Sequence, residues 1–163
     1  QIHIQADEIN KAIALYELAL SQPASEEDAD LLSDLGYLYH QMGKLKRAVE
    51  VYGRSLQLYP QSATTLLLRG MALLNLKRNQ AALRDFNEAI RLSPYLDNAY
   101  WGRGQVFIAL EDYSWAVASF TRAIELNPDE PEYYESRAKG FRAMGKISEA
   151  NVDLQAFEKR STL

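Results

Sequence analysis

A period of 34 residues constrains this chain more than any other feature of its sequence. Glycine, proline and alanine each recur at that spacing, and a large side chain follows four residues after each alanine. The recurring residues are Gly36, Gly70 and Gly104; Pro60, Pro94 and Pro128; Ala48, Ala82, Ala116 and Ala150; and Tyr52, Phe86, Phe120 and Leu154. Four columns with one period indicate an internal repeat. The chain therefore divides into units 29–62, 63–96, 97–130 and 131–163, preceded by a segment 1–28.

Each unit contains two stretches with the apolar spacing of an α-helix, separated by a short break. In the unit 63–96, Leu66, Gly70 and Leu73 share one stripe of the first helix. Small residues are expected where two helices approach closely, with the aromatic side chains filling the space beside them. The proline ends the second helix, because its ring cannot continue the hydrogen-bond ladder. One helix pair cannot bury its apolar face alone, so neighbouring pairs must stack.

This combination resembles the tetratricopeptide repeat family, whose pattern runs from a large apolar residue through Leu-Gly and an aromatic residue to Ala, aromatic, Ala and Pro. The unit 97–130 carries the pattern at Tyr100, Gly104, Phe107, Ala116, Phe120, Ala123 and Pro128. The resemblance covers residues 29–160. It implies an all-α fold, a right-handed solenoid of stacked antiparallel helix pairs that forms one domain. It also implies a protein–protein interaction scaffold or adaptor and not an enzyme.

The leading segment fits the second helix of a preceding unit. Within residues 6–22, Ala12, Tyr16 and Ala19 reproduce the spacing of alanine, aromatic residue and alanine. The first helix of that unit is expected to be absent or reduced to Gln1–Gln5, and an acidic linker follows at Pro23 to Asp28. The helix is either half of a repeat with more repeats upstream or an N-terminal cap. We favour the first interpretation, because a cap does not need the repeat signature.

The last unit differs at the end of its second helix. Glu158 and Arg160 stand where the other units have apolar residues such as Ile124 and Leu126. Apolar residues there would bury against a next repeat, whereas charged residues prefer water. Since terminal repeats need a polar outer face, the sequence predicts that the array ends here.

Arginine recurs on the first helices at the same period, at Arg69, Arg103 and Arg137. Sixteen residues after each arginine stand Asp85, Ser119 and Asp153, whereas the first unit has Leu35 and Val51 at the two places. In each unit the two positions are thus either both polar or both apolar. We expect these positions to face each other across a helix pair or between adjacent pairs, where an Arg–Asp bond holds the register. The alternative is an arginine stripe that binds acidic ligands, which we favour less because the aspartates follow the arginines.

Composition excludes several classes of function. A formal net charge of −4 argues against nucleic-acid binding, and no apolar run reaches the roughly 20 residues of a membrane span. Without cysteine there is no disulfide or thiolate metal site. The two histidines, His3 and His40, lack ligand spacing, and no HExxH motif occurs, so we predict no cofactor, metal or catalytic residues. The chain begins at Gln1 without a signal sequence, which leaves its location and any leader or anchor open.

The resemblance implies that the first helices line a concave groove in which a partner lies. Its positions carry apolar residues in the middle of the chain and polar residues at both ends, a pattern typical of interaction surfaces. The predicted partner-binding residues are Tyr37, Leu67, Met71, Leu74, Trp101, Gln105, Ile108, Lys139 and Arg142. Trp101 is predicted to form a floor of the groove, with a notch beside it because Gly102 is small. The occupant would be an apolar or amphipathic segment of another protein; the alternative is a structural or self-assembly module whose groove is covered by its own chain or a neighbouring subunit.

One known subclass of the family clamps acidic C-terminal tails with Lys and Asn on one repeat, Asn on the next, then Lys and Arg. Neither alignment of that pattern on this chain supplies a cation. The positions hold Ser33, Tyr37, Leu68, Asn98 and Gly102 in one alignment, and Leu67, Met71, Gly102, Glu132 and Ser136 in the other. We therefore expect no carboxylate clamp.

Overall fold

The structure is a computed structural model that describes residues 2–21 and 28–161, with side chains described for 7–20 and 28–161. All regular secondary structure in these residues is helical, which confirms the all-α expectation. The chain divides into two compact units, residues 1–78 and 79–163, and each is considered by itself.

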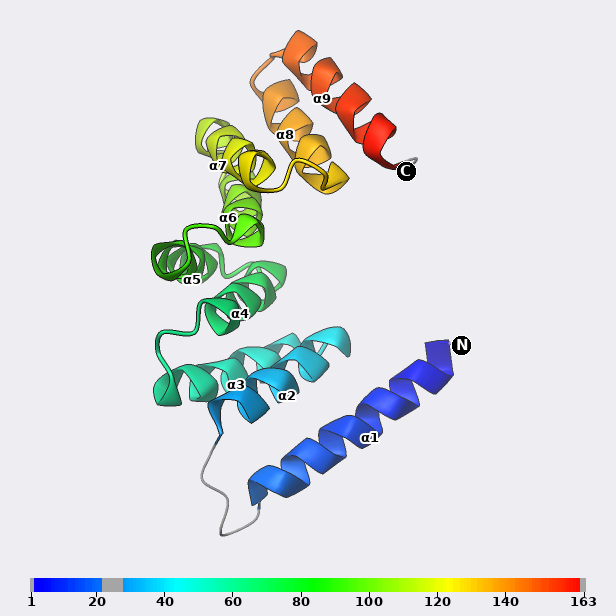
Figure 1. Ribbon diagram of the computed structural model, residues 1–163, viewed down its shortest axis with the longest axis vertical. Helices are drawn as coiled ribbons and strands as arrows, with labels where there is room; N and C mark the ends of the chain where they lie inside the picture. The colour runs from blue at the N-terminus through cyan, green and yellow to red at the C-terminus, as the bar shows by residue number, and fades with distance from the viewer. Residues whose placement is uncertain (1, 22–27, 162–163) are drawn as a thin grey trace. The chain divides into compact units, whose positions relative to one another are not determined.

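The first compact unit holds four helices within its described residues: α1 (Ile2–Ser21), α2 (Ala29–Gln41), α3 (Leu45–Leu58) and α4 (Ala63–Asn75). Side chains cap two of them, because Asp28 Oδ1 accepts from the backbone N–H of Asp30 at 2.8 Å and Ser62 Oγ accepts from Thr65 N–H at 3.2 Å. Between α2 and α3 the chain reverses at Gly43, whose positive φ of 69° suits glycine. The two helices consequently lie antiparallel and side by side (Figure 1).

The second compact unit holds α5 (Asn79–Leu92), α6 (Asp97–Ala109), α7 (Tyr113–Leu126), α8 (Pro131–Ala143) and α9 (Ile147–Ser161). Its helices α6 and α7, and likewise α8 and α9, form antiparallel pairs (Figure 1). Pro131 starts α8, where its missing N–H costs no helical hydrogen bond. In each repeat unit predicted from the sequence, the helix earlier in the chain is here termed the first helix (α2, α4, α6 and α8), and the later one the second helix.

Glycine and the aromatic column form close helix contacts, as the sequence predicts. A Cβ atom on Gly36 would lie 2.6 Å from the Tyr52 ring, and one on Gly104 would lie 2.5 Å from the Phe120 ring. Both rings are fully buried. The glycines thus let an aromatic ring of the second helix lie directly on the backbone of the first helix.

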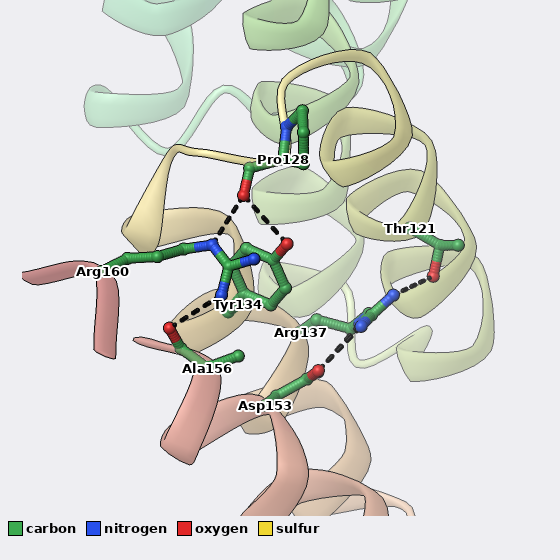
Figure 2. Close-up of polar contacts among 7 residues, drawn as sticks. All are labelled: Thr121, Pro128, Tyr134, Arg137, Asp153, Ala156 and Arg160. Carbon is green, nitrogen blue, oxygen red and sulfur yellow. Dashed lines mark hydrogen bonds and ion pairs between the residues drawn. The ribbon is translucent and has the colours of Figure 1, made fainter. Parts of the chain in front are cut away.

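The recurring arginines and the polar residues sixteen positions after them, here termed the charge ladder, join helices as expected, both within a pair and to the preceding pair. Arg137 on α8 donates two hydrogen bonds to Asp153 on α9, at 2.8 and 2.7 Å, and a third to Thr121 Oγ1 on α7 at 3.1 Å (Figure 2). One repeat earlier, Arg103 donates to Ser119 Oγ at 3.1 Å and to Asn87 Oδ1 at 3.3 Å. These two arginines therefore hold neighbouring helices together.

At the end of α9, Glu158 is exposed but Arg160 is half-buried, so the expectation of a solvated arginine is wrong. Its guanidinium lies 4.3 Å from the centre of the Tyr134 ring and donates to the backbone carbonyls of Pro128 at 2.7 Å and Ala156 at 3.1 Å (Figure 2). A planar cation can stack on an aromatic face and donate hydrogen bonds at the same time, which an apolar residue cannot do.

The leading segment is helical from Ile2, so residues 2–5 continue α1 and are not a reduced first helix. Ile13 is buried, and Ile9 and Leu20 pack against the core beside α2 and α3. The predicted linker at Pro23 to Asp28 lies outside the described residues except for Asp28.

Candidate protein-interaction surface

In the first compact unit, the predicted binding residues lie on the first helices α2 and α4, which touch each other. Two polar contacts join these helices. Ser33 Oγ and Thr65 Oγ1 lie 3.1 Å apart, and Asn75 Nδ2 lies 3.2 Å from His40 Nε2. The two helices therefore present their side chains as one surface.

This surface keeps apolar side chains in reach of solvent. Tyr37 is 46% exposed, and Leu67, Met71 and Leu74 are partly exposed at the i, i+4, i+7 spacing of one helix stripe. The neighbouring stripe of α4, which includes Leu66, is buried in the core. One side of α4 thus holds the fold together, and the adjacent stripe remains available for contact.

His40 lies at the polar edge of this surface. Desolvation by burial holds its pKa below the usual 6.5. The imidazole is therefore neutral at pH 7, so its Nε2 can accept a hydrogen bond from the Asn75 amide.

In the second compact unit, α6 and α8 are likewise in contact and carry the remaining predicted residues. Trp101 Nε1 and Gln105 Nε2 both donate to Ser136 Oγ, each at 3.0 Å. The Trp101 ring also lies 6.4 Å from the Tyr133 ring, measured between centroids. Trp101 is therefore held in one orientation by α8 while its ring stays partly exposed.

The predicted notch beside Trp101 does not form. Gly102 is buried, and a Cβ atom there would lie 2.5 Å from the Phe86 ring. Gly102 consequently serves the packing of α6 on α5. Ile108 is partly exposed.

Lys139 and Arg142 form an exposed basic edge on α8. Lys139 Nζ lies 2.8 Å from Glu135 Oε1 on the same helix, and the Lys139 side chain is 63% exposed. A surface pair of this kind contributes little to stability, so both cations stay available to a partner.

Sequence reasoning did not identify the residues that support this surface. Tyr133 is almost fully buried; its hydroxyl donates to Asp97 Oδ2 at 2.8 Å and also lies 3.0 Å from Asn98 Oδ1. Desolvation by burial, followed by the hydrogen bond to Asp97, raises the pKa of Tyr133, so the hydroxyl stays a donor. The contacts from His40 to Asn75, from Asn98 to Tyr133 and from Trp101 to Ser136 all span 35 residues, one repeat plus one position, but the residue types at these positions differ from repeat to repeat and form no column in the sequence.

Within the described residues, no group of three or more His, Cys, Asp or Glu side chains is arranged to hold a metal ion. Among the described helices, none is long and apolar enough to cross a membrane.

Two family models match the sequence. Residues 5–89 match the model described as anaphase-promoting complex, cyclosome, subunit 3, and residues 67–131 match a model described as tetratricopeptide repeat. Comparison with curated proteins gives no match.

Solved structures match nearly the whole chain. A crystal structure of MamA is 22% identical, with a TM-score of 0.87 over 96% of this chain and 90% of that one. MamA 41-end from Desulfovibrio magneticus RS-1 is 19% identical, with a TM-score of 0.85 over 98% and 89% of the two chains. At these identities the likeness concerns the fold, and it confirms the expected class, an all-α solenoid of stacked helix pairs.

Proposed function

The chain belongs to the tetratricopeptide repeat family, and we propose that it is an interaction scaffold whose first helices hold an apolar or amphipathic segment of another protein. Family membership supports the broader statement, a protein-interaction or self-assembly scaffold. One observation supports the narrower proposal. The stripe of Leu67, Met71 and Leu74 remains partly exposed although the adjacent stripe of the same helix is buried.

Three properties of the surface favour such a ligand. An amphipathic helix presents its anchors at i, i+3, i+4 and i+7, which matches the spacing of an apolar stripe on α4. Trp101 is already oriented by Ser136, so little side-chain entropy is lost when it becomes an anchor. In the second compact unit, Lys139 and Arg142 would attract acidic residues of a segment that contacts α6 and α8.

The proposal is tested by quantitative co-purification with the wild-type chain and with Met71→Glu and Trp101→Ala. We expect both variants to lose partner capture by about tenfold or more, because each removes an anchor from the contact. The control is Tyr95→Ala, since Tyr95 is 81% exposed and lies in the loop between α5 and α6, outside the helices that carry the predicted binding residues. Circular dichroism must show unchanged helical content in every variant. Equal capture by all four proteins would overturn the proposal.

Self-assembly through the same residues is the alternative within the broader function. Sedimentation velocity across a wide range of concentration separates the two. A dimer that Met71→Glu dissociates would assign the surface to a second copy of the chain, whereas a monomer at all concentrations would exclude self-assembly. Tetratricopeptide arrays are typically non-catalytic, and the candidate surface supplies no convergent set of catalytic groups, so we propose no enzymatic activity.

A further inference from the structure

Five basic residues of the first compact unit gather at two places, the junction of α2 with α3 and the residues that follow α4. All five side chains are exposed, and together they are here termed the basic turn patch: Lys44, Lys46, Arg47, Lys77 and Arg78. The contact between His40 near the end of α2 and Asn75 at the end of α4 holds the two places side by side. The patch is basic although the chain as a whole has a net charge of −4.

A pocket lies between the two places. Its volume is about 310 Å³, and it is lined by Gly43, Lys44, Leu45, Lys46, Arg47 and Leu76. Leu45 and Leu76 are partly exposed in it, and Lys77 and Arg78 follow Leu76 directly in the chain. The patch therefore surrounds two apolar side chains with cations.

The fold makes little use of these cations. In the described part of the chain, none of the five forms an ion pair with an acidic side chain. The ammonium group of Lys44 lies 5.9 Å from the centre of the Tyr39 ring, a contact that is weak when the cation is exposed. Arg137, by comparison, is bonded to Asp153 inside its helix pair. The charges of the patch are thus available to a ligand.

The repeat itself does not require positive charge at these positions. In the third unit, Glu111 and Asp112 occupy the places of Lys77 and Arg78. The backbone is nonetheless alike, since Lys77 and Glu111 have positive φ angles of 58° and 60°. A charge that the turn needed for its own conformation would recur with the period, as the glycines and alanines of the helices do. The positive charge is therefore a property of this patch and not of the turn geometry.

The surroundings of the patch favour a narrow ligand. Arg47 also lines a second pocket, which includes Glu17 and Glu50. An anionic membrane lying flat on the patch would bring its negative surface close to these carboxylates. A nucleic-acid backbone needs a longer basic track than two turns, and it offers no apolar side chain to the leucines of the pocket. A short peptide can place carboxylates on the cations and an apolar side chain against the leucines.

We propose that the basic turn patch binds a short acidic segment of another protein, in which Asp or Glu residues flank one apolar residue. The carboxylates would accept charge-assisted hydrogen bonds from the lysines and arginines. The apolar residue would remove Leu45 and Leu76 from water. None of the five cations stands at a position of the carboxylate clamp or on the stripe of Leu67, Met71 and Leu74, so this is a second ligand site, which does not depend on the proposed function.

The test uses the full chain and two peptides with neutral ends, Glu-Glu-Leu-Glu-Glu and its uncharged analogue Gln-Gln-Leu-Gln-Gln. Binding is followed through the backbone amide signals of the chain in NMR spectra. We expect the acidic peptide to shift the signals of residues 43–47 and 76–78 saturably, and the analogue to leave them in place. Added salt should weaken the binding, because ions screen contacts between exposed charges.

The variant Lys77→Glu/Arg78→Asp copies the turn of the third unit, so the backbone tolerates it, and it should weaken peptide binding by about tenfold or more. The matched control is Arg84→Glu/Lys146→Glu, which changes the net charge equally at exposed positions of the second compact unit. It should bind the peptide as the wild type does. Met71→Ala, a neutral change on the surface of the proposed function, should do so as well.

Three results would overturn the inference: no saturable shift with the acidic peptide, equal shifts with both peptides, or binding that the turn variant leaves unchanged. Vesicles that contain phosphatidylserine, or a thymidine oligonucleotide, binding at the patch where the peptide does not would overturn it in favour of a phosphate ligand. Self-association of the chain that the turn variant abolishes would also overturn it, since the patch would then belong to a second copy.

Discussion

Tyr52 places a polar hydroxyl group in the buried core. The corresponding residues of the next two units are Phe86 and Phe120, and all three rings are fully buried. The Tyr52 hydroxyl is buried without a hydrogen-bond partner among the described residues. Its burial raises the pKa of Tyr52, so the group stays neutral. An unsatisfied buried hydroxyl weakens a fold by about 1–3 kcal/mol.

We therefore predict that Tyr52→Phe stabilises the chain by about 1 kcal/mol, because the ring is kept and only the unsatisfied hydroxyl is removed. Urea denaturation followed by circular dichroism measures the difference. Tyr39→Phe is the matched control, since the Tyr39 hydroxyl donates to Glu17 and its loss should destabilise. A destabilising effect of Tyr52→Phe would show that the hydroxyl has a favourable partner.

His40 makes the first compact unit sensitive to acid. Burial lowers its pKa below 6.5, so the folded chain binds this proton less readily than the unfolded chain does. Stability is therefore fully present above the unfolded pKa and falls as the pH drops from about 6.5 toward the folded pKa. Protonation of Nε2 also removes the acceptor that faces Asn75.

The chain has two histidines, so an NMR titration can assign both signals, using a His40→Gln variant. We expect His40 to titrate below 6.5 and the wild type to lose more stability than His40→Gln between pH 7 and pH 5.5. Comparison with the variant removes the contribution of carboxylates that titrate nearby. A pKa of His40 at or above 6.5 contradicts the prediction.

At the scale of the helices, the Arg137–Asp153 ion pair can be tested by replacing it with the apolar pair that another repeat of the same chain carries. Asp153 is 2% exposed, so Arg137→Leu would leave a carboxylate buried without its cation, at a cost of about 3–5 kcal/mol. The double variant Arg137→Leu/Asp153→Val copies the apolar pair that the first repeat has at Leu35 and Val51. We expect it to recover most of the loss, because buried ion pairs are often replaceable by apolar residues of similar volume.

Thermal and urea unfolding of the wild type, both single variants and the double variant gives the coupling between the two positions. Additive effects, with the double variant as unstable as the sum of the single ones, would mean that the pair does not act as a unit. Thr121 also accepts from Arg137, so Thr121→Val should cost less than the loss of the arginine.

Helices and their packed faces could be predicted from the sequence because both depend on short periodic spacings. Gly36 against Tyr52 and Arg137 against Asp153 are each 16 residues apart and recur at the repeat period. The contacts that orient Trp101 could not be predicted in that way. They depend on Ser136 in the next repeat, and a single serine on a helix carries no signal for its partner. Gly102 was misassigned because helical spacing alone does not say which of two adjacent stripes faces the neighbouring helix.

At the scale of the whole molecule, the contacts inside each compact unit are local along the chain. Within each compact unit, the described helices touch only their nearest or next-nearest neighbours in sequence. In such an array, stability is approximately a sum over repeats and their interfaces. A destabilising change in one compact unit should consequently loosen that unit far more than helices several repeats away.

Two glycine substitutions, one in each compact unit, test this locality. Gly36→Ala pushes a methyl group against the Tyr52 ring, and Gly104→Ala does the same against Phe120; overpacking of this kind costs about 1–3 kcal/mol. Hydrogen exchange read by mass spectrometry should show faster exchange mainly in α2 and α3 for the first variant and mainly in α6 and α7 for the second. Gly53→Ala is the control, because its new Cβ would meet only the Arg69 Nη1 atom at 3.9 Å and alanine favours the helix. Uniformly faster exchange along the chain in both glycine variants would instead show that the repeats unfold as one cooperative body.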